Sequence, residues 1–568
     1  MSSIYEERPW LSLYPPGTPS DLEISNKTAI DVFEDTAAKR PQAAAIHYFD
    51  DTITYGELNS LAESLAAALS DLGLGKGDRI ALDLQNVPQF LISQYAAWKL
   101  GAIVVPLNPM YKEKELEYYL NDSGAKIVVA LESTTYQTVK GVLAQVPVEH
   151  VITTSEIDFL PPGQPLPELL KDFQKGKPPE TLDFLELIDK YRLNTPPRAE
   201  VNPDGVAHLI YTSGTTGPPK GAMNTHRNVV FAAEAAYKTF CNVGASDVVL
   251  GASPLFHVTG TVGHLAIASL VGAPLVIFYR FDPAETLRLI EKWQVSNIVA
   301  AITFYFALLD HPDFPRRNLS SLKKLFSGGA PVPAGFVDQF EQASGLYIHH
   351  TYGLTETTSP GLFPPLVVRA PIDPETGALS TGFPIPNSYA KIVDAEEGTR
   401  EMPAGELGEI IIKGPMIIPG YWGKPEETAY AIRDGWLYTG DIGKMDKDGW
   451  FYVVDRKKDL INASGFKVWP REVEDVLYQH PAVRETAVVG VPDAYRIETV
   501  KAFVSLREEY EGRISPQELI EFCRQRMAAY KYPRIIEFIP EIPKTLTGKF
   551  MRRVLREQEL KKNMTTRE

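Results

Sequence analysis

The chain has little cysteine and no long apolar run among its 568 residues. Only Cys241 and Cys523 occur, which argues against a disulfide framework or a cysteine-built metal site and fits a reducing cytoplasm. The longest apolar stretch, Leu265 to Phe278, contains serine, glycine and proline and is shorter than the roughly 20 residues that span a bilayer. The N-terminus is acidic where a secretory signal would be basic and then apolar. We therefore predict a cytoplasmic protein without an integral membrane segment, which leaves peripheral membrane contact and a homodimer open.

Basic residues are also in deficit. There are 57 Lys and Arg against 72 Asp and Glu, a net charge of −15, which argues against nucleic acid as a partner. The deficit is uneven, because Arg456 to the C-terminus holds 22 basic and 17 acidic residues, a net of +5, and leaves −20 for the rest. This pattern indicates a separate basic module that could cover an anionic ligand, although charge alone fits a domain with scattered lysines equally well.

Helical and strand patterns alternate through the first half of the chain. Thr54 to Glu57 has the form of a capping box, and leucines at helical spacing follow it. Apolar segments typical of buried strands recur between such helices, which predicts parallel sheets with helices on both faces. Residues 155–200 are rich in proline and charge and are expected to form a surface excursion, whereas 390–421 indicate a small β subdomain. A charged run at 455–459 predicts a hinge between domains 1–455 and 456–568.

The segment from Tyr211 to Gly221 carries the strongest chemical signal. Gly214 and Gly217 let the backbone turn its N–H groups toward an anion, and Lys220 adds a positive charge. Hydroxyl groups come from Thr212, Ser213, Thr215 and Thr216. Two prolines precede the lysine, so this is not the Walker pattern. We interpret the segment as a polyphosphate-binding loop; a flexible surface loop is the alternative.

The segment resembles the phosphate-binding signature of the adenylate-forming superfamily, which includes acyl-CoA synthetases, luciferases and peptide-synthetase adenylation domains. Further matches follow in the family's order: Tyr352-Gly-Leu-Thr-Glu-Thr357, Tyr438-Thr-Gly-Asp441, Asp455 to Ile461, Ser464-Gly-Phe-Lys467 and Pro543 to Lys549. The resemblance implies an α/β fold, with a large N-terminal domain of two α/β subdomains plus a small β subdomain, and a small mobile α+β C-terminal domain.

The resemblance also implies ATP as a substrate and Mg²⁺ as its counterion. Glu356 matches the glutamate that holds the magnesium, and a hard oxygen ligand suits that ion when phosphates complete its shell. Asp441 matches the aspartate that accepts the ribose hydroxyls, and Arg456 the arginine that supports it. The remaining nucleotide-binding residues are predicted as Gly329, Ala330, Pro331, Thr351, Tyr352, Gly353 and Thr355.

Lys549 is the residue expected to carry adenylation, together with Glu356, Thr212 and Lys220. A cation near the α-phosphate stabilises the charge that accumulates when a carboxylate attacks it. In the family the C-terminal domain then rotates so that coenzyme A can react. The resemblance assigns Lys458 to the pivot of this rotation. It assigns Ser464, Gly465 and Lys467 to the surface of the C-terminal domain that faces coenzyme A.

The acid pocket is predicted from Pro254 to Gly260, which resembles the corresponding segment of fatty-acid and aryl CoA ligases. Amino-acid-activating relatives usually carry an aspartate there, and its absence disfavours an amino-acid substrate. Predicted pocket residues are His257, Val258, Gly260, Ala301 and Gly328. The long signature from Asp434 to Lys458 favours a medium- or long-chain fatty acid.

Four alternatives stay open at this point. They are an aryl-acid CoA ligase, an enzyme that loads a separate carrier protein, a luciferase-like oxygenase and a non-catalytic binding protein. The last is disfavoured because Lys549 and Glu356 are both present.

Overall fold

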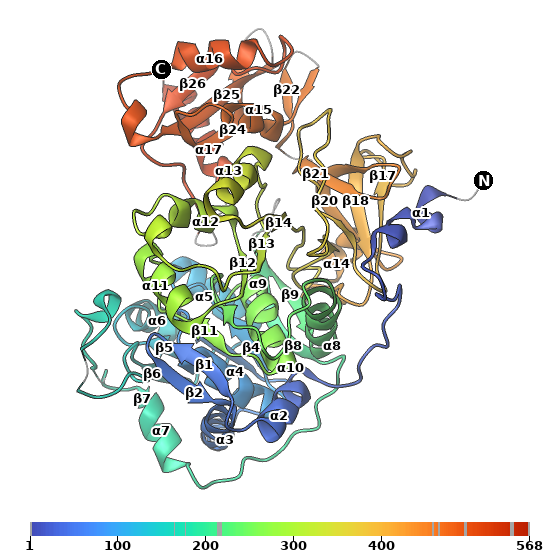
Figure 1. Cartoon of the computed structure of the whole chain (residues 1–568). Helices are drawn as coiled ribbons and strands as arrows, with labels where there is room; N and C mark the ends of the chain where they lie inside the picture. Colours follow the sequence, from blue (N-terminus) through green and yellow to red (C-terminus); the bar gives the residue numbers. More distant parts are fainter. Residues whose placement is uncertain are drawn as a thin grey trace.

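The computed structural model describes residues 3–163, 165–176, 178–212, 218–456, 459–463, 466–493, 497–545 and 550–565. Two seven-stranded sheets form the body of the molecule, as predicted (Figure 1). The first runs in the order β14 (Ile348–His350), β13 (Lys324–Ser327), β12 (Asn297–Ala300), β10 (Val249–Leu250), β11 (Leu275–Ile277), β1 (Ala44–Tyr48) and β2 (Asp51–Thr54). The second runs β7 (Leu182–Asp183), β6 (His150–Thr154), β5 (Ile127–Leu131), β3 (Arg79–Asp83), β4 (Ile103–Pro106), β8 (Val206–Thr212) and β9 (Lys220–Thr225).

Both sheets are parallel except for one antiparallel edge strand each, β2 and β9. Their strands are buried on both faces because helices cover them, which is why they read as continuous apolar runs. The helices of this part are α2 (Ala29–Lys39), α3 (Tyr55–Asp71), α4 (Pro88–Lys99), α5 (Glu113–Ser123), α6 (Tyr136–Val142), α7 (Phe184–Lys190), α8 (His226–Ala232), α9 (Val258–Gly260), α10 (Ile267–Val271), α11 (Pro283–Trp293), α12 (Ile302–Leu309) and α13 (Ala334–Ser344).

Local signals in the sequence explain several of these helices. The capping box predicted at Thr54 is present, since its hydroxyl accepts from the Glu57 N–H and the Glu57 side chain accepts from the Thr54 N–H. Two segments are π-helical: η4 (Ala233–Phe240) continues α8, and η5 (Thr261–Ala266) joins α9 to α10. Such wide turns are rare in proteins, and many of those that occur lie at functional sites.

The predicted surface excursion at 155–200 is only partly right. Strand β7 extends the second sheet, and the side chains of Phe184, Leu187 and Ile188 in α7 are buried in the main core. Proline and charge dominate the composition of this stretch, but three apolar residues at helical spacing suffice to fix one helix.

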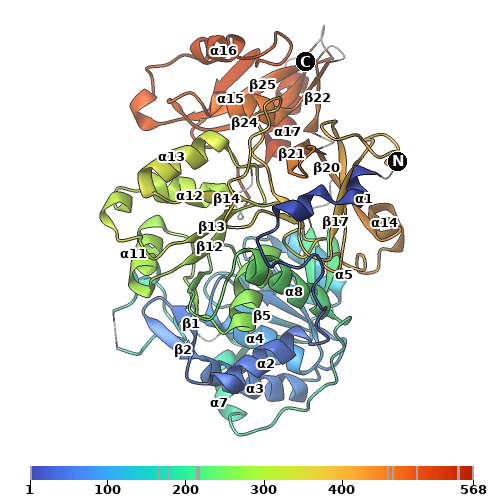
Figure 2. The ribbon, with the colours of Figure 1, turned by 45° about the vertical axis from the view of Figure 1, so that its right-hand side comes forward.

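An antiparallel sheet forms the small β subdomain, and it extends further along the chain than predicted. Its strands are β17 (Tyr389–Val393), β18 (Gly408–Lys413), β20 (Trp436–Met445), β19 (Ile432–Arg433) and β21 (Phe451–Arg456), with α14 (Pro425–Ala431) beside them. The short pair β15 (Leu362–Phe363) and β16 (Phe383–Pro384) leads into it. The N-terminal helix α1 (Ile4–Glu7) packs on this subdomain, with the Tyr5 hydroxyl donating to the Met402 carbonyl (Figure 2).

The smaller C-terminal domain is α+β, as predicted. Its sheet contains β23 (Phe466–Val468), β22 (Ile461–Ala463), β25 (Ile497–Leu506), β24 (Val483–Asp493) and β26 (Ile535–Phe538), with helices α15 (Pro470–Leu477), α16 (Pro516–Arg524) and α17 (Arg552–Thr565). It has its own apolar core and lies over α12 and α13 (Figure 1). Arg507 and Asp310 connect the two domains at 3.7 Å. Among the described helices, none combines the length and apolar character needed to cross a membrane.

Candidate active site

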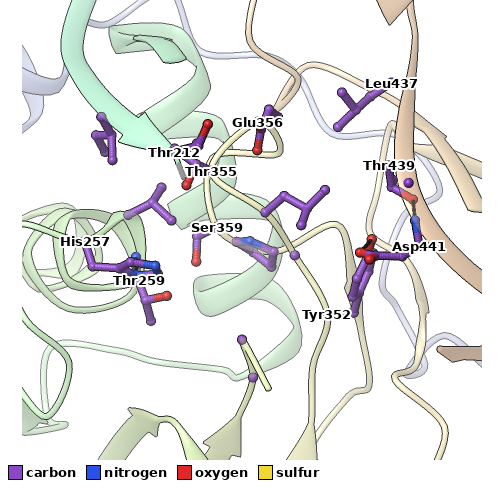
Figure 3. A pocket seen from close by; sticks show the side chains of 18 of the residues that line it. Thr212, His257, Thr259, Tyr352, Thr355, Glu356, Ser359, Leu437, Thr439 and Asp441 are labelled. Atoms are coloured by element: carbon purple, nitrogen blue, oxygen red, sulfur yellow. Dashed lines mark hydrogen bonds between the residues drawn. The ribbon is translucent and has the colours of Figure 1, made fainter. Parts of the chain in front are cut away.

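A cavity of about 820 Å³ opens between the first two subdomains, the β subdomain and the C-terminal domain. Figure 3 shows Thr212, Thr355 and Glu356 near one another, with His257 and Thr259 on one side and Tyr352 and Asp441 on the other. Motifs that lie more than 200 residues apart in sequence therefore line one space. The predicted residues that line it are Thr212, Lys220, His257, Val258, Ala301, Gly328, Gly329, Thr351, Tyr352, Gly353, Thr355, Glu356 and Asp441.

The segment predicted to bind phosphate lies between β8 and β9 in the sequence. Thr212 pairs with Lys220 across the antiparallel ladder, so both ends of the loop are fixed at the cavity. The sequence predicted the first strand but not the second. Ser213, Gly214, Thr215, Thr216 and Gly217 lie outside the described residues.

Tyr421 connects Lys220 to Glu356. The ammonium of Lys220 lies 5.0 Å from the centroid of the Tyr421 ring, and the Tyr421 hydroxyl donates to Glu356 Oε1 at 2.7 Å. A backbone bridge between Ala222 and Tyr421 holds the ring there. Burial, reinforced by the neighbouring Glu356 charge, raises the pKa of Tyr421, so the ring stays a neutral donor. The sequence did not predict this residue because its two contacts, Glu356 and Lys220, lie 65 and 201 positions away in the chain.

The loop after Tyr352 is held in one shape by its own backbone. A side chain at Gly353 would lie 1.6 Å from the Ser359 carbonyl oxygen, so only glycine fits. Thr358 and Ser359 have positive φ values of 51° and 90°, a left-handed conformation that non-glycine residues seldom adopt. The Thr357 hydroxyl accepts from the Leu354 N–H and donates to the Ser359 carbonyl. This strained, internally bonded loop presents Thr355 and Glu356 to the cavity.

Two of the predicted motifs meet directly at Tyr352 and Asp441. The Tyr352 hydroxyl donates to Asp441 Oδ2 at 2.6 Å, and both residues are buried. Asp441 lies opposite Arg456 in the β20–β21 register, so the backbone brings together the aspartate and the arginine assigned to it. The predicted contact of Arg456 involves its side chain, which lies outside the described part.

The carboxyl ends of β13 and β14 form the wall predicted for adenine. Neighbouring parallel strands end at one edge of a sheet, and ligands of open α/β sheets bind there. A Cβ atom at Gly328 would lie 2.5 Å from Thr351 Oγ1, so the close approach of these turns requires glycine. Ala330 and Pro331, also predicted for this wall, do not line the cavity.

The side of the cavity next to His257 is apolar. Phe256 and Val258 line it, together with Val299, Ala300 and Ala301 at the carboxyl end of β12. His257 caps α9, with Nδ1 accepting from the Thr259 N–H at 3.2 Å.

Gly260 was predicted for this pocket but lies outside the lining. Its Cβ would be 2.1 Å from the Pro254 carbonyl oxygen, so glycine is needed where α9 packs against the loop that precedes it.

His264, which the sequence analysis missed, supports this end from behind. Its Nε2 accepts from the Ser253 N–H at 3.0 Å, and Ser253 lines the cavity. Complete burial lowers the pKa of His264 to about 4, so the ring is a neutral acceptor at neutral pH.

The C-terminal domain reaches the same cavity through Thr545. Thr545 precedes Lys549 by four residues in the last predicted motif. Lys549, Lys458, Ser464 and Gly465 lie outside the described residues, and for Lys467 only the backbone, in β23, is described.

A buried ionic cluster joins the predicted hinge to the C-terminal helices. Arg552 contacts Asp455 at 3.2 Å and Glu474 at 2.6 Å, while the Arg471 N–H donates to Asp455 at 3.0 Å. Arg471 also donates to the carbonyl of Val453 at 2.6 Å, so α15 is tied back to the large domain. Separating Arg552 from Asp455 would leave a buried charge without its partner, so a movement of the C-terminal domain that breaks this contact carries a cost.

The residues fit a magnesium ion that arrives with a nucleotide. Among the described residues there is no group of three His, Cys, Asp or Glu side chains that could hold a metal by themselves. Glu356 offers a carboxylate to the cavity that Thr212 and Thr355 also line, with oxygen lone pairs beyond the one that Tyr421 uses. Mg²⁺ is commonly bound by one or two carboxylates together with phosphate oxygens and water.

Similarity to known proteins extends over nearly the whole chain. The model for the AMP-binding enzyme family matches residues 33–422, and the model for its C-terminal domain matches 472–549. A long-chain-fatty-acid–CoA ligase of Bacillus subtilis is 40% identical, covering 97% of this chain and 98% of its own; one of Escherichia coli is 36% identical with the same coverage. The crystal structure of an anthranilate CoA ligase with anthranoyl-AMP is similar at a TM-score of 0.83 and 29% identity, covering 95% of this chain and 98% of the other. The chain belongs to the AMP-binding enzyme family, as an adenylate-forming acyl-CoA synthetase.

Proposed function

We propose that this AMP-forming acid–thiol ligase acts on medium- or long-chain fatty acids. The observation that carries the substrate is the apolar end of the cavity, where the described lining residues bring no carboxylate that could hold a substrate ammonium. An acyl chain gains about 0.8 kcal/mol for each methylene buried there. The two bacterial relatives named as long-chain-fatty-acid–CoA ligases support the same substrate class.

The reaction has two steps, and its substrates are ATP, coenzyme A and the acid. In the first step a carboxylate oxygen attacks the α-phosphorus, the bond toward the β-phosphate breaks, and pyrophosphate leaves. In the second step the thiol of coenzyme A attacks the acyl carbonyl and AMP leaves. Magnesium, when bound, neutralises charge on the phosphate oxygens.

We assign the nucleotide end of the cavity to the phosphates and the nucleoside. Thr212 and Lys220 anchor the phosphate loop, and Glu356 holds the ion. Asp441, kept in place by Tyr352, accepts the ribose hydroxyls. The flat backbone at Gly328 and Gly329 lies against adenine. Lys549 acts at the α-phosphate, and the position of Thr545 at the cavity supports this, because Thr545 precedes Lys549 by four residues in the same motif.

We further propose that the C-terminal domain, residues 456–568, moves between the two steps about a hinge near 455–459. The ionic cluster around Arg552 and Asp455 would hold the adenylate-forming arrangement. Lys458→Pro fixes φ near −65° at the pivot and should let the adenylate form but block the thioester. Equal loss of both steps would contradict this assignment.

The decisive experiment measures pyrophosphate release and coenzyme A consumption with acetate, octanoate, palmitate, cinnamate and phenylalanine. We expect AMP and pyrophosphate as products and kcat/KM that rises from acetate to palmitate. ADP as the main product would contradict adenylation. A maximum with phenylalanine or acetate would contradict the substrate assignment.

An aryl acid is the second candidate, favoured by the structural similarity to the anthranilate CoA ligase. A higher kcat/KM for cinnamate than for palmitate would select it. Product formation only with an added carrier protein would instead select a carrier-loading role.

We also propose a cytoplasmic homodimer with, at most, peripheral membrane contact. Light scattering of the purified protein tests the dimer, and sedimentation with vesicles tests the contact.

A further inference from the structure

Helix α5 contacts the chain on both sides of the segment predicted to bind phosphate. The Tyr118 hydroxyl on α5 donates to the Pro219 carbonyl at 2.7 Å. Asp122 on the same helix accepts, through Oδ2, from the Tyr211 hydroxyl at 2.8 Å. Tyr211 lines the cavity, whereas Tyr118 and Asp122 lie behind it and do not. One helix therefore holds the chain just before Thr212 and just before Lys220.

The spacing of these two residues explains how a single helix makes both contacts. Tyr118 and Asp122 are four positions apart, so their side chains project from the same face of α5. The ring of Tyr119 meets the Tyr211 ring edge-on, with centroids 4.7 Å apart, and packs it against the helix. Burial, together with the hydrogen bond to Asp122, raises the pKa of Tyr211, so its hydroxyl is a donor at neutral pH.

The second carboxylate oxygen of Asp122 reaches a different part of the chain. Asp122 Oδ1 lies 3.2 Å from the Lys424 ammonium. Lys424 ends the segment 420–424, which backbone hydrogen bonds join to β9. This segment contains Tyr421, the residue that donates to Glu356. Asp122 thus connects the end of β8 to the segment that positions Glu356.

The two parts that Asp122 connects meet at the cavity. Figure 3 shows Thr212, the neighbour of Tyr211 in the chain, close to Glu356. The Asp122 side chain is only 12% exposed, so its charge is screened by water less than that of a surface pair. A displacement of this one carboxylate would therefore be felt on both sides.

We propose that Tyr118, Asp122 and Lys424 are positioning residues for adenylation, and that α5 holds the predicted phosphate-binding segment and Glu356 at a fixed separation. Tyr118 acts on the segment, Lys424 acts on Glu356 through the 420–424 stretch, and Asp122 acts on both. The inference rests on the proposed function, which assigns the phosphates of ATP to this end of the cavity and magnesium to Glu356.

The two half-reactions separate this role from a merely structural one. Adenylation needs the β- and γ-phosphates of ATP and the magnesium ion that they carry. A preformed acyl adenylate brings neither, so it does not depend on the separation that α5 maintains. A positioning defect should therefore appear in pyrophosphate release and be absent from thioester formation, whereas a folding defect lowers both.

The test uses the acid with the highest kcat/KM and makes three measurements. They are kcat/KM for ATP in pyrophosphate release, the Mg²⁺ concentration for half-maximal release, and thioester formation from the preformed adenylate of that acid.

Each variant should give its own pattern. Tyr118→Phe removes one neutral hydrogen bond, so kcat/KM for ATP should fall about fivefold while the Mg²⁺ requirement stays unchanged. Lys424→Met removes an ion pair and should raise the Mg²⁺ requirement about threefold. Asp122→Asn should do both, with a fall of about tenfold in kcat/KM for ATP. Thioester formation should stay within twofold in all three.

Two matched controls alter similar contacts away from the cavity. Tyr136→Phe removes a tyrosine hydroxyl on α6 that donates to the Pro179 carbonyl, and Asp78→Asn breaks an ion pair with Lys126 at 2.9 Å. Both controls should leave all three measurements within twofold. Lys424→Arg keeps the cation and should keep the Mg²⁺ requirement of the wild type.

The double variant Asp122→Asn/Lys424→Met tests the ion pair itself. If the two residues act on Glu356 through one contact, the double variant needs no more Mg²⁺ than Asp122→Asn alone. Additive increases in the Mg²⁺ requirement would contradict the connection.

Equal losses in both half-reactions, or losses no larger than those of the controls, would overturn the inference. A Mg²⁺ requirement unchanged in both Lys424→Met and Asp122→Asn would do the same. Unfolding of a variant is detected by its Tm; if Asp122→Asn unfolds, Tyr118→Phe and Lys424→Met decide. Wild type that releases no pyrophosphate with any acid would instead refute the proposed function.

Discussion

The two ends of the active-site cavity are built on different principles. The end that we assign to the nucleotide is polar, and its side chains are held by hydrogen bonds between loops, such as those of Tyr352 with Asp441 and Tyr421 with Glu356. The end that we assign to the acid is apolar and is held by packing, where Gly260 lies against a loop and Gly263 against Tyr237 of η4. Hydrogen bonds are directional and therefore suit one arrangement of polar ligand groups. Apolar packing surfaces can instead change shape through substitutions and accept different acids. The nucleotide end should therefore respond to single polar substitutions, and the acid end to changes in volume.

The largest effect is expected from Lys549→Ala. Adenylation should fall by roughly 10²-fold or more, because one charge that stabilises the transition state is lost. The same variant, given a preformed acyl adenylate, should still form the thioester. Pyrophosphate release and thioester formation are measured separately. Lys562→Ala, which removes an exposed lysine of the same domain, is the control and should leave both rates unchanged.

Glu356→Gln should lower adenylation by at least about tenfold and raise the Mg²⁺ concentration needed for half-maximal rate. The acid KM should stay constant, since this residue serves the polar end only. Glu397→Gln is the matched control, because Glu397 is exposed and also lines the cavity. If both variants shift the Mg²⁺ dependence equally, Glu356 is not the ligand.

Tyr352→Phe removes the hydroxyl that donates to Asp441. A hydrogen bond to a charged group contributes about 1.5 kcal/mol or more, so the KM for ATP should rise about tenfold. Tyr438→Phe removes a comparable hydroxyl that donates to the Gly398 carbonyl and should change this KM far less. An equal rise in the KM for ATP in both variants would mean that the Tyr352 hydroxyl does not position Asp441.

His264→Gln should have the smallest effect on turnover, within twofold at pH 7.5. Its effect is on the pH dependence of stability. The folded pKa of about 4 lies below the usual 6.5, so unfolding takes up a proton as the pH falls from 6.5 toward 4, and stability is lost in that range. Between pH 6.5 and 5 this loss is about 2 kcal/mol.

Glutamine preserves an acceptor for the Ser253 N–H but does not titrate. The variant should therefore show a shallower loss of stability in denaturant unfolding at pH 6.5 and 5. Parallel pH curves for variant and wild type would contradict the role assigned to His264.

Much of the nucleotide end could be predicted from sequence. Its residues come in short contiguous motifs, because a loop that wraps a phosphate or a ribose draws its glycines, hydroxyls and charges from a few neighbouring positions. The alternation that predicts two parallel sheets is equally local, as is the capping box at Thr54. Tyr421 and His264 were not predicted, because a single aromatic or histidine residue outside a motif gives no local signal of its role.

Sequence by itself determined the family, the two-step chemistry and the α/β architecture with its smaller C-terminal domain. Only the tertiary structure brought Tyr237 and Ser359 together in the cavity wall, with Gly263 against the tyrosine. The physical reason is that hydrogen-bonding chemistry requires particular residue types in fixed order, whereas an apolar wall accepts many residues and acquires its shape from helices that meet only after folding.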